Sequence, residues 1–391
     1  MTADAAEADR RREVREAARG WRRAGAIDEA ALAAVVSAYP DDRVRLGPAF
    51  RTLAFIFTVL ALNAIFVFVV AVFEPGEDVA GPLAIAFGLS LCVLTDVQIG
   101  SFKRDEGGTE TATALVGLGY VVGGAGLLMW EAGLREGALF PAFFALATVA
   151  FAAAAKRWGM AVCAALAAVF FFVLLAQCRG GRFLWIAAAV MMIPLSLKAS
   201  ESPRLPPAHR RSSKAVLAIA VVALYAALHL GSWDSGFVEG LASTGTNRWR
   251  DSPLRPVAIA GTALIPLAAI AFGIHTRRRL VLDLGLALGI ASLVTLRLYV
   301  HVAPLWVVLI FGGAAAIAAA LAARRFLASG RAGERGGLTA EPLFEDLSRQ
   351  AELEAAAALA AAPGARPPAH DDRTLTPGGG RFGGGGASGE Y

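Results

Sequence analysis

The chain has 391 residues, of which 56% are hydrophobic, and its mean hydropathy is +0.56. A water-soluble domain of this length is less apolar and interrupts its apolar runs with polar faces, so the composition excludes a soluble globular protein. The net charge of +5 does not indicate a nucleic-acid partner, because basic loops are what the membrane insertion machinery reads.

Residues 1–51 are expected to form a basic, cytoplasmic helical hairpin. Its first helix, 5–23, interleaves arginines with glutamates, and Asp28 is the predicted N-cap of a second helix, 29–38. The apolar seam between the helices is predicted to comprise Trp21, Ile27, Leu32, Val35 and Val36. Two roles stay open for this hairpin: contact with anionic lipid headgroups, or docking of a cytoplasmic protein.

The region 52–326 predicts an all-α, polytopic transmembrane helix bundle. Its apolar runs are about as long as the roughly 20 residues that a helix needs to cross the hydrocarbon core of a bilayer. We expect nine to ten spans, most simply ten, over residues 52–73, 80–99, 111–130, 138–155, 159–177, 183–198, 214–232, 256–275, 280–301 and 304–324.

The distribution of lysine and arginine predicts that both termini are cytoplasmic, because short basic loops stay on that side. The basic residues of the expected inward loops are Lys103, Arg104, Lys156, Arg157, Lys198, Arg204, Arg210, Arg211, Lys214, Arg277, Arg278 and Arg279. The expected outward loops carry only Arg135, Arg179, Arg182, Arg248, Arg250 and Arg255. An even number of spans agrees with this orientation.

Two further patterns concern the spans and the outward loop 233–255. Trp233 and Trp249 lie near the ends of this loop, as aromatic side chains of a headgroup-level belt do. Pairs of glycines four residues apart, such as Gly119 and Gly123, predict close packing of helices.

After the last span, 327–362 is expected to form a cytoplasmic linker followed by a helix from residue 343. The final segment, 363–391, is rich in glycine and proline. It cannot bury enough apolar surface to offset its chain entropy, so we expect disorder there.

The stretch Trp21-Arg22-Arg23-Ala24-Gly25-Ala26-Ile27-Asp28-Glu29, followed by a short helix and multiple spans, resembles an uncharacterised family of predicted polytopic bacterial membrane proteins with an N-terminal helical hairpin. This family carries a domain-of-unknown-function label. The resemblance implies a bacterial cytoplasmic (inner) membrane location and brings no catalytic residues.

Ionisable side chains inside a bilayer are costly and are therefore functional candidates. Asp283, Arg297 and His301 lie near one face of the ninth expected span, which predicts a polar track along it. In the alternative interpretation, which we favour, each group reaches the nearest headgroup layer, because all three lie near a helix end.

The sequence gives little sign of catalysis. Ser90 with His229 has a faint likeness to an intramembrane serine protease, but the residues flanking Ser90 do not match such a motif. Neither the three cysteines nor the five histidines show metal-ligand spacing, so no catalytic residue, cofactor or metal is predicted.

We therefore expect a non-enzymatic component of the membrane, whose partners are the lipid bilayer and a cytoplasmic protein bound through 1–51 or the tail. A transporter of a small or amphipathic solute is the first alternative, and an intramembrane enzyme is the second. The sequence leaves the oligomeric state open.

Overall fold

The computed structural model describes residues 3–23, 26–40, 43, 47–102, 107–241, 255–276, 278–300, 305–328, 334–335 and 338–339. These residues form two compact units, Met1–Val308 and Leu309–Tyr391. In the described part of the chain, a helix occupies each of the ten predicted intervals. The predicted tail helix from residue 343 and the segment 363–391 lie outside the described residues.

The first unit begins with the helical hairpin and continues with nine of the ten long helices. The hairpin consists of α1 (Ala3–Arg23) and α2 (Glu29–Ala38). The long helices are α3 (Pro48–Phe73), α4 (Glu77–Gly100), α5 (Thr109–Glu131), α6 (Glu136–Trp158), α7 (Ala161–Ala176), α8 (Gly181–Glu201), α9 (Pro207–Leu228), α12 (Arg255–Thr276) and α13 (Arg279–Val300). Two short helices, α10 (Leu230–Ser235) and α11 (Phe237–Gly240), follow α9.

The second unit contains most of α14 (Leu305–Ala328) and a pair of antiparallel two-residue strands, β1 (Glu334–Arg335) and β2 (Leu338–Thr339). The strand pair lies in the segment predicted to be a polar linker.

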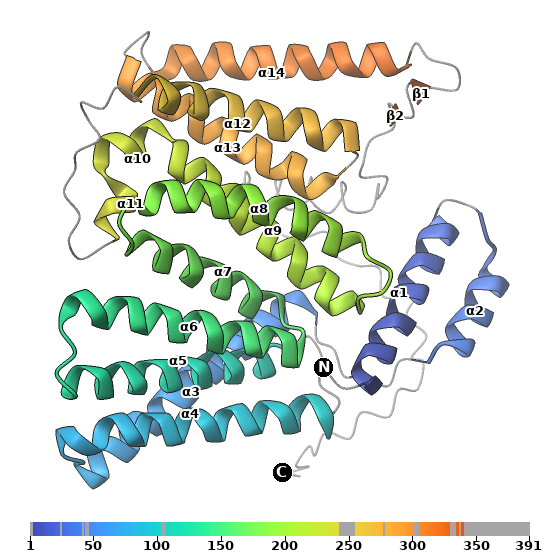
Figure 1. Cartoon of the computed structure of the whole chain (residues 1–391). Coiled ribbons are helices and arrows are strands. Elements are labelled where there is room, and N and C mark those ends of the chain that lie inside the picture. The colour runs from blue at the N-terminus through green and yellow to red at the C-terminus, as the bar shows by residue number, and fades with distance from the viewer. Residues whose placement is uncertain are drawn as a thin grey trace, which may run out of the picture. The chain divides into compact units, whose positions relative to one another are not determined.

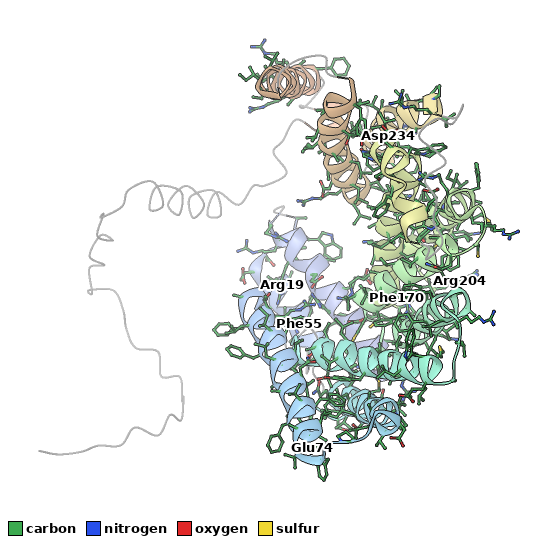
Figure 2. All side chains as sticks on the ribbon, turned by 90° about the vertical axis from the view of Figure 1, so that its left-hand side faces the viewer. Arg19, Phe55, Glu74, Phe170, Arg204 and Asp234 are labelled. Atoms are coloured by element: carbon green, nitrogen blue, oxygen red, sulfur yellow. The ribbon has the colours of Figure 1, made fainter. Side chains whose placement is uncertain are left out.

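Among the described residues, eight helices are long and apolar enough to cross a membrane: α3, α4, α5, α6, α8, α9, α12 and α13. α7 is as apolar but shorter, at 16 residues. α3 shows the membrane character most clearly, because none of the residues in its most apolar window is buried by the rest of the protein. Figure 2 shows its side chains, from Phe55 to Glu74, projecting from the ribbon along the helix. The chain is thus an all-α, multi-pass transmembrane protein, as predicted.

Neighbouring helices pack as hairpins, with the most extensive contacts between α4 and α5, α6 and α7, α8 and α9, and α12 and α13 (Figure 1). Hydrogen bonds and ion pairs between side chains connect the helix ends that lie on the side of the α1–α2 hairpin. We call this group of helix ends the hairpin end. Arg157 and Trp158 at the end of α6 bind Asp96 near the end of α4, at 2.8–3.2 Å. Ser212 at the start of α9 donates to the carbonyl of Gly159, 3.3 Å away.

The hairpin end also includes the end of α8, whose Glu201 pairs with Arg278 before α13. α1 lies there too, because its Asp9 and Glu13 pair with Arg211 and Arg210 of α9. The ends of α4, α6 and α8 therefore meet the beginnings of α9 and α13. Successive helices therefore alternate in direction, as helices that cross a membrane one after another must.

The predicted N-cap is confirmed: the Asp28 carboxylate accepts from the N–H of Ala31 at 2.7 Å. The predicted apolar seam of the hairpin is only partly covered, since α2 buries none of its residues and Trp21 is 53% exposed. Small and polar residues of α1 are buried instead, among them Asp9 and Ala18. The ion pairs to α9, rather than the apolar seam, hold this hairpin.

Two expectations about helix limits were wrong. The seventh span was predicted over 214–232, but α9 begins at Pro207 and ends at Leu228. A proline fits the first turn of a helix, because no intrahelical bond needs its missing N–H, and it therefore starts α9 early. The sixth span was predicted over 183–198, but α8 is longer at both ends and continues through Pro194 for 21 residues.

Candidate functional site

Of the three residues of the predicted polar track, only Asp283 has a described side chain. Asp283 lies on the exposed side of α13, where its side chain is 61% exposed and pairs with Arg279 one turn earlier, at 3.5 Å. The side chain of Arg297 and the whole of His301 lie outside the described residues.

Ser90 and His229 have separate surroundings. Ser90 is on an exposed face of α4 and donates to the carbonyl of Phe87, in its own helix, at 2.7 Å. His229 contacts Thr295 of α13, with 2.8 Å between Nε2 and Oγ1. The described contacts of these two residues give no support to a catalytic pair.

His229 lies in the break between α9 and α10, inside a small polar cluster. The N–H of Ser232 donates to its Nδ1 at 3.3 Å, so the ring proton is on Nε2, which donates to Thr295. Thr262 of α12 supports the same break, because its hydroxyl accepts from the N–H of Leu230 at 2.8 Å. We assign this cluster to the structure of the helix break.

A cavity of about 590 Å³ lies between α3, α4 and α5. Its lining is mainly apolar and comes from Phe66, Val70, Ala80, Ala84, Val116, Gly119, Gly123, Gly124, Leu127 and two polar residues, Asn63 and Tyr120. A volume of this size is typical of pockets that hold small molecules.

Asn63 and Tyr120 form a polar pair near the middle of their helices. The Tyr120 hydroxyl donates to Asn63 Oδ1 at 3.0 Å, and Asn63 Nδ2 donates to the carbonyl of Val59 at 2.8 Å. The rings of Phe66 and Phe87 pack around Tyr120, with centroids 4.3 and 5.1 Å away. The cavity therefore offers an apolar surface with one polar pair, Asn63 and Tyr120.

The expectation that Gly119 and Gly123 pack helices together was wrong. A Cβ atom at either position would meet no atom within 4 Å, and both glycines line the cavity. The close approach of α4 and α5 uses other glycines: a Cβ on Gly88 would lie 2.5 Å from the carbonyl oxygen of Gly117. One on Gly124 would lie 2.6 Å from the carbonyl oxygen of Gly81.

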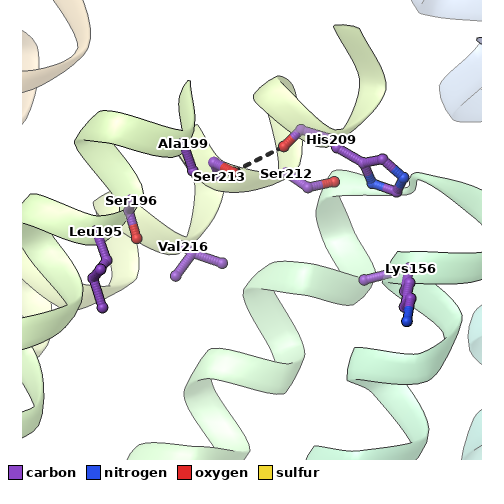
Figure 3. A pocket seen from close by; sticks show the side chains of 9 residues that line it. Lys156, Leu195, Ser196, Ala199, His209, Ser212, Ser213 and Val216 are labelled. Carbon is purple, nitrogen blue, oxygen red and sulfur yellow. Dashed lines mark hydrogen bonds between the residues drawn. The ribbon is translucent and has the colours of Figure 1, made fainter. Parts of the chain in front are cut away.

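A second pocket, of about 300 Å³, lies at the hairpin end between α6, α8 and α9 (Figure 3). Its polar lining comes from Lys156, Ser196, His209, Ser212 and Ser213. The apolar lining comes from Ala155, Leu195, Ala199 and Val216.

At the opposite end of the helices, a buried arginine binds the segment that follows α9. Arg182, at the start of α8, has a fully buried side chain, and its Nε and Nη2 donate to the two carboxylate oxygens of Glu239 at 2.8 and 2.6 Å. Its Nη1 and Nη2 also donate to the carbonyls of Ala227 and Ser232, at 2.8 and 3.1 Å. The guanidinium lies 4.8 Å from the ring centroid of Trp233.

Two expectations for this end are corrected. Arg182 was assigned to an outward loop, although it lies in the first turn of α8, and Trp233 was assigned to a headgroup-level aromatic belt. Both are buried against each other, because the guanidinium finds its acceptors on the α9–α11 segment that folds over the start of α8. Trp249, the other residue assigned to the belt, lies outside the described residues.

No group of three or more metal-ligating side chains occurs among the described residues. Comparisons with family models, with curated protein sequences and with solved structures give no match to this chain.

Proposed function

We propose that this protein is a non-enzymatic component of the bacterial cytoplasmic membrane, with both termini in the cytoplasm. Its α1–α2 hairpin would be a docking module for a cytoplasmic protein. The observation that carries this proposal is the attachment of α1 to α9 through Asp9–Arg211, at 3.1 Å, and Glu13–Arg210. These pairs hold the hairpin at one position beside the helix ends and leave α2 without a buried residue.

The charge distribution supports the proposed orientation. The hairpin end carries Lys156, Arg157, Lys198, Arg204, Arg210, Arg211, Lys214, Arg278 and Arg279 in addition to the arginines of α1. Basic residues concentrate on the cytoplasmic side of membrane proteins. Ten crossings would return the chain to that side after α14.

Photo-crosslinking in intact membranes tests the docking role. A photoreactive residue at Trp21 or Ala33, both exposed on the hairpin, should yield a protein adduct of defined mass. The same residue at Ala132, exposed in the turn after α5, is the matched control and should yield none.

The ion pair provides the specificity test. Arg211→Asp should remove the hairpin adduct, because it repels Asp9, and the exchange Asp9→Arg with Arg211→Asp should restore it. Lipid adducts alone at Trp21 and Ala33 would support the headgroup-contact interpretation instead and would contradict the docking role.

The second candidate function is transport of a small or amphipathic solute, and the cavity between α3, α4 and α5 favours it. Leucine at both Gly119 and Gly123 would place its side chain in this cavity, since a Cβ atom at either position meets no atom within 4 Å. Under this alternative the double variant should lose uptake of the solute while its melting temperature is kept. Retained uptake would count against a route through the cavity.

A further inference from the structure

The cavity between α3, α4 and α5 contains a hydrogen-bond donor that has no acceptor among the described residues. Asn63 Nδ2 donates to the carbonyl of Val59 at 2.8 Å, and Asn63 Oδ1 accepts from the Tyr120 hydroxyl at 3.0 Å. The first bond fixes the orientation of the amide, because a carbonyl oxygen can only accept. Nδ2 carries two hydrogens, and Val59 accepts one of them. The second N–H of Asn63 is therefore left for a molecule in the cavity that this side chain lines.

This donor lies near the middle of the hydrocarbon core of the membrane. Asn63 is near the middle of α3, which has 26 residues, and Tyr120 is near the middle of α5, which has 23. At this depth neither water nor a phospholipid headgroup is at hand as an acceptor, and a polar group without a partner is costly. A molecule that brings an acceptor to this position, such as a carbonyl oxygen, would satisfy the amide.

The rest of the cavity is elongated and apolar. Its lining on α5 follows one face of the helix from Val116 to Leu127, which is roughly 16 Å at the rise of an α-helix. Asn63 and Tyr120 lie toward one end of this length, whereas Val70 and Leu127 lie at the other, near the α3–α4 turn. A ligand would therefore have its polar group at mid-depth and its apolar part directed toward the helix ends. A phospholipid has the opposite arrangement, since its polar groups lie at the membrane surface.

The lining also limits the charge and the shape of the ligand. No acidic or basic side chain contributes to it, so a charged group at this depth would have no counter-ion. An uncharged ligand is therefore favoured. The rings of Phe66 and Tyr120 line the cavity beside the amide, with their centroids 4.3 Å apart, and aromatic side chains of this kind pack well against a flat ring.

The cavity is accessible from the side of the helices. Val70 of α3 and Gly119, Gly123 and Leu127 of α5 line it and are exposed. The exposed surface of these transmembrane helices is apolar and faces lipid chains. A lipid-soluble ligand can thus enter from the bilayer without passing through water.

We infer that this cavity binds an uncharged, lipid-soluble carbonyl compound with a flat ring, which is the chemistry of a prenylated quinone. One carbonyl oxygen accepts from the second N–H of Asn63, and the ring packs against Phe66 and Tyr120. The hydrocarbon tail lies along Gly123 and Leu127. The inference is independent of the docking role proposed for the hairpin. It shares its cavity with the second candidate function but requires binding alone, whereas transport also requires uptake.

Binding to the purified full chain in detergent micelles tests the inference. The probes are tritiated decyl menadione, a fully substituted naphthoquinone, and unlabelled decylnaphthalene, which has a similar ring system and tail without carbonyl groups. The quinone should bind saturably. Decylnaphthalene should displace it only at about tenfold higher concentration, the difference expected for one hydrogen bond. This comparison on the wild type does not depend on how any variant folds.

Three variants then locate the site. Asn63→Leu should weaken binding of the quinone about tenfold and make the two compounds equivalent, because it removes the donor. Leucine at both Gly119 and Gly123 should abolish saturable binding, because its side chains occupy the cavity. Ser90→Ala is the matched control: it removes an exposed hydroxyl of α4 that does not line the cavity, and it should leave binding unchanged.

Four outcomes would overturn the inference: no saturable binding, equal affinity of the wild type for the two compounds, a preference for the quinone that persists in Asn63→Leu, or binding retained in the double leucine variant. Binding of the quinone without uptake of a solute would support the inference and count against the transport alternative.

Discussion

Replacing Arg182 by alanine is expected to lower the free energy of unfolding by about 3–5 kcal/mol, the usual loss when one partner of a buried ion pair is removed. The substitution leaves the Glu239 carboxylate, 16% exposed, without its bidentate donor. It also leaves the carbonyls of Ala227 and Ser232 without the donors that Arg182 provides. Reversible unfolding in mixed micelles would measure the effect, and α11 should become more sensitive to protease.

Two further variants separate loss of the ion pair from loss of side-chain volume. Arg182→Met with Glu239→Gln removes both charges, so it should recover part of the stability lost in the single variant. Arg179→Ala, an exposed arginine in the preceding turn, is the matched control and should change stability by less than about 0.5 kcal/mol. A similar loss in both alanine variants would contradict the buried role of Arg182.

Alanine at Gly88 is expected to destabilise the α4–α5 hairpin by about 1–3 kcal/mol or more, the range typical of overpacking. The added Cβ would lie 2.5 Å from the Gly117 carbonyl oxygen and 2.7 Å from the Val121 nitrogen. Both are backbone atoms, so the helices would have to separate. The unfolding free energy of the full chain in micelles would report this change.

Gly119→Ala makes the same chemical change at a position where the new methyl group meets no atom within 4 Å. It should be neutral or stabilising by up to about 1 kcal/mol, because alanine is the better helix former. The reverse ranking of these two variants would contradict the way α4 and α5 are packed here.

The sequence predicted the ten helical intervals well, because the length of an apolar run is a local property that hydropathy reads directly. The predicted limits of the helices were less accurate where a proline lies beside or within the apolar run, as at Pro207 and Pro194. Pro207 begins α9 before the apolar run starts, and Pro194 lies within α8 without ending it.

Contacts between distant residues were not predictable in the same way. Arg182 and Glu239 are 57 positions apart, and in the sequence each looks like an ordinary loop charge. The spacing of Gly119 and Gly123 matches a packing motif, but spacing alone does not say which face of α5 meets α4. Asn63 is a polar residue within the first apolar run, but its pairing with Tyr120 depends on the packing of α3 against α5, which the sequence does not predict.

The location of three positions relative to the membrane tests the central claim most directly. With Cys92, Cys163 and Cys178 replaced, single cysteines at Thr2, Gly240 and Ser388 would be labelled in intact cells with a membrane-impermeant maleimide. Gly240 can accept the side chain, since a Cβ there meets no atom within 4 Å. If the chain crosses the membrane ten times, Gly240 should be labelled in intact cells, and Thr2 and Ser388 only after permeabilisation. Labelling of the two termini on opposite sides, or of all three positions on one side, would contradict it.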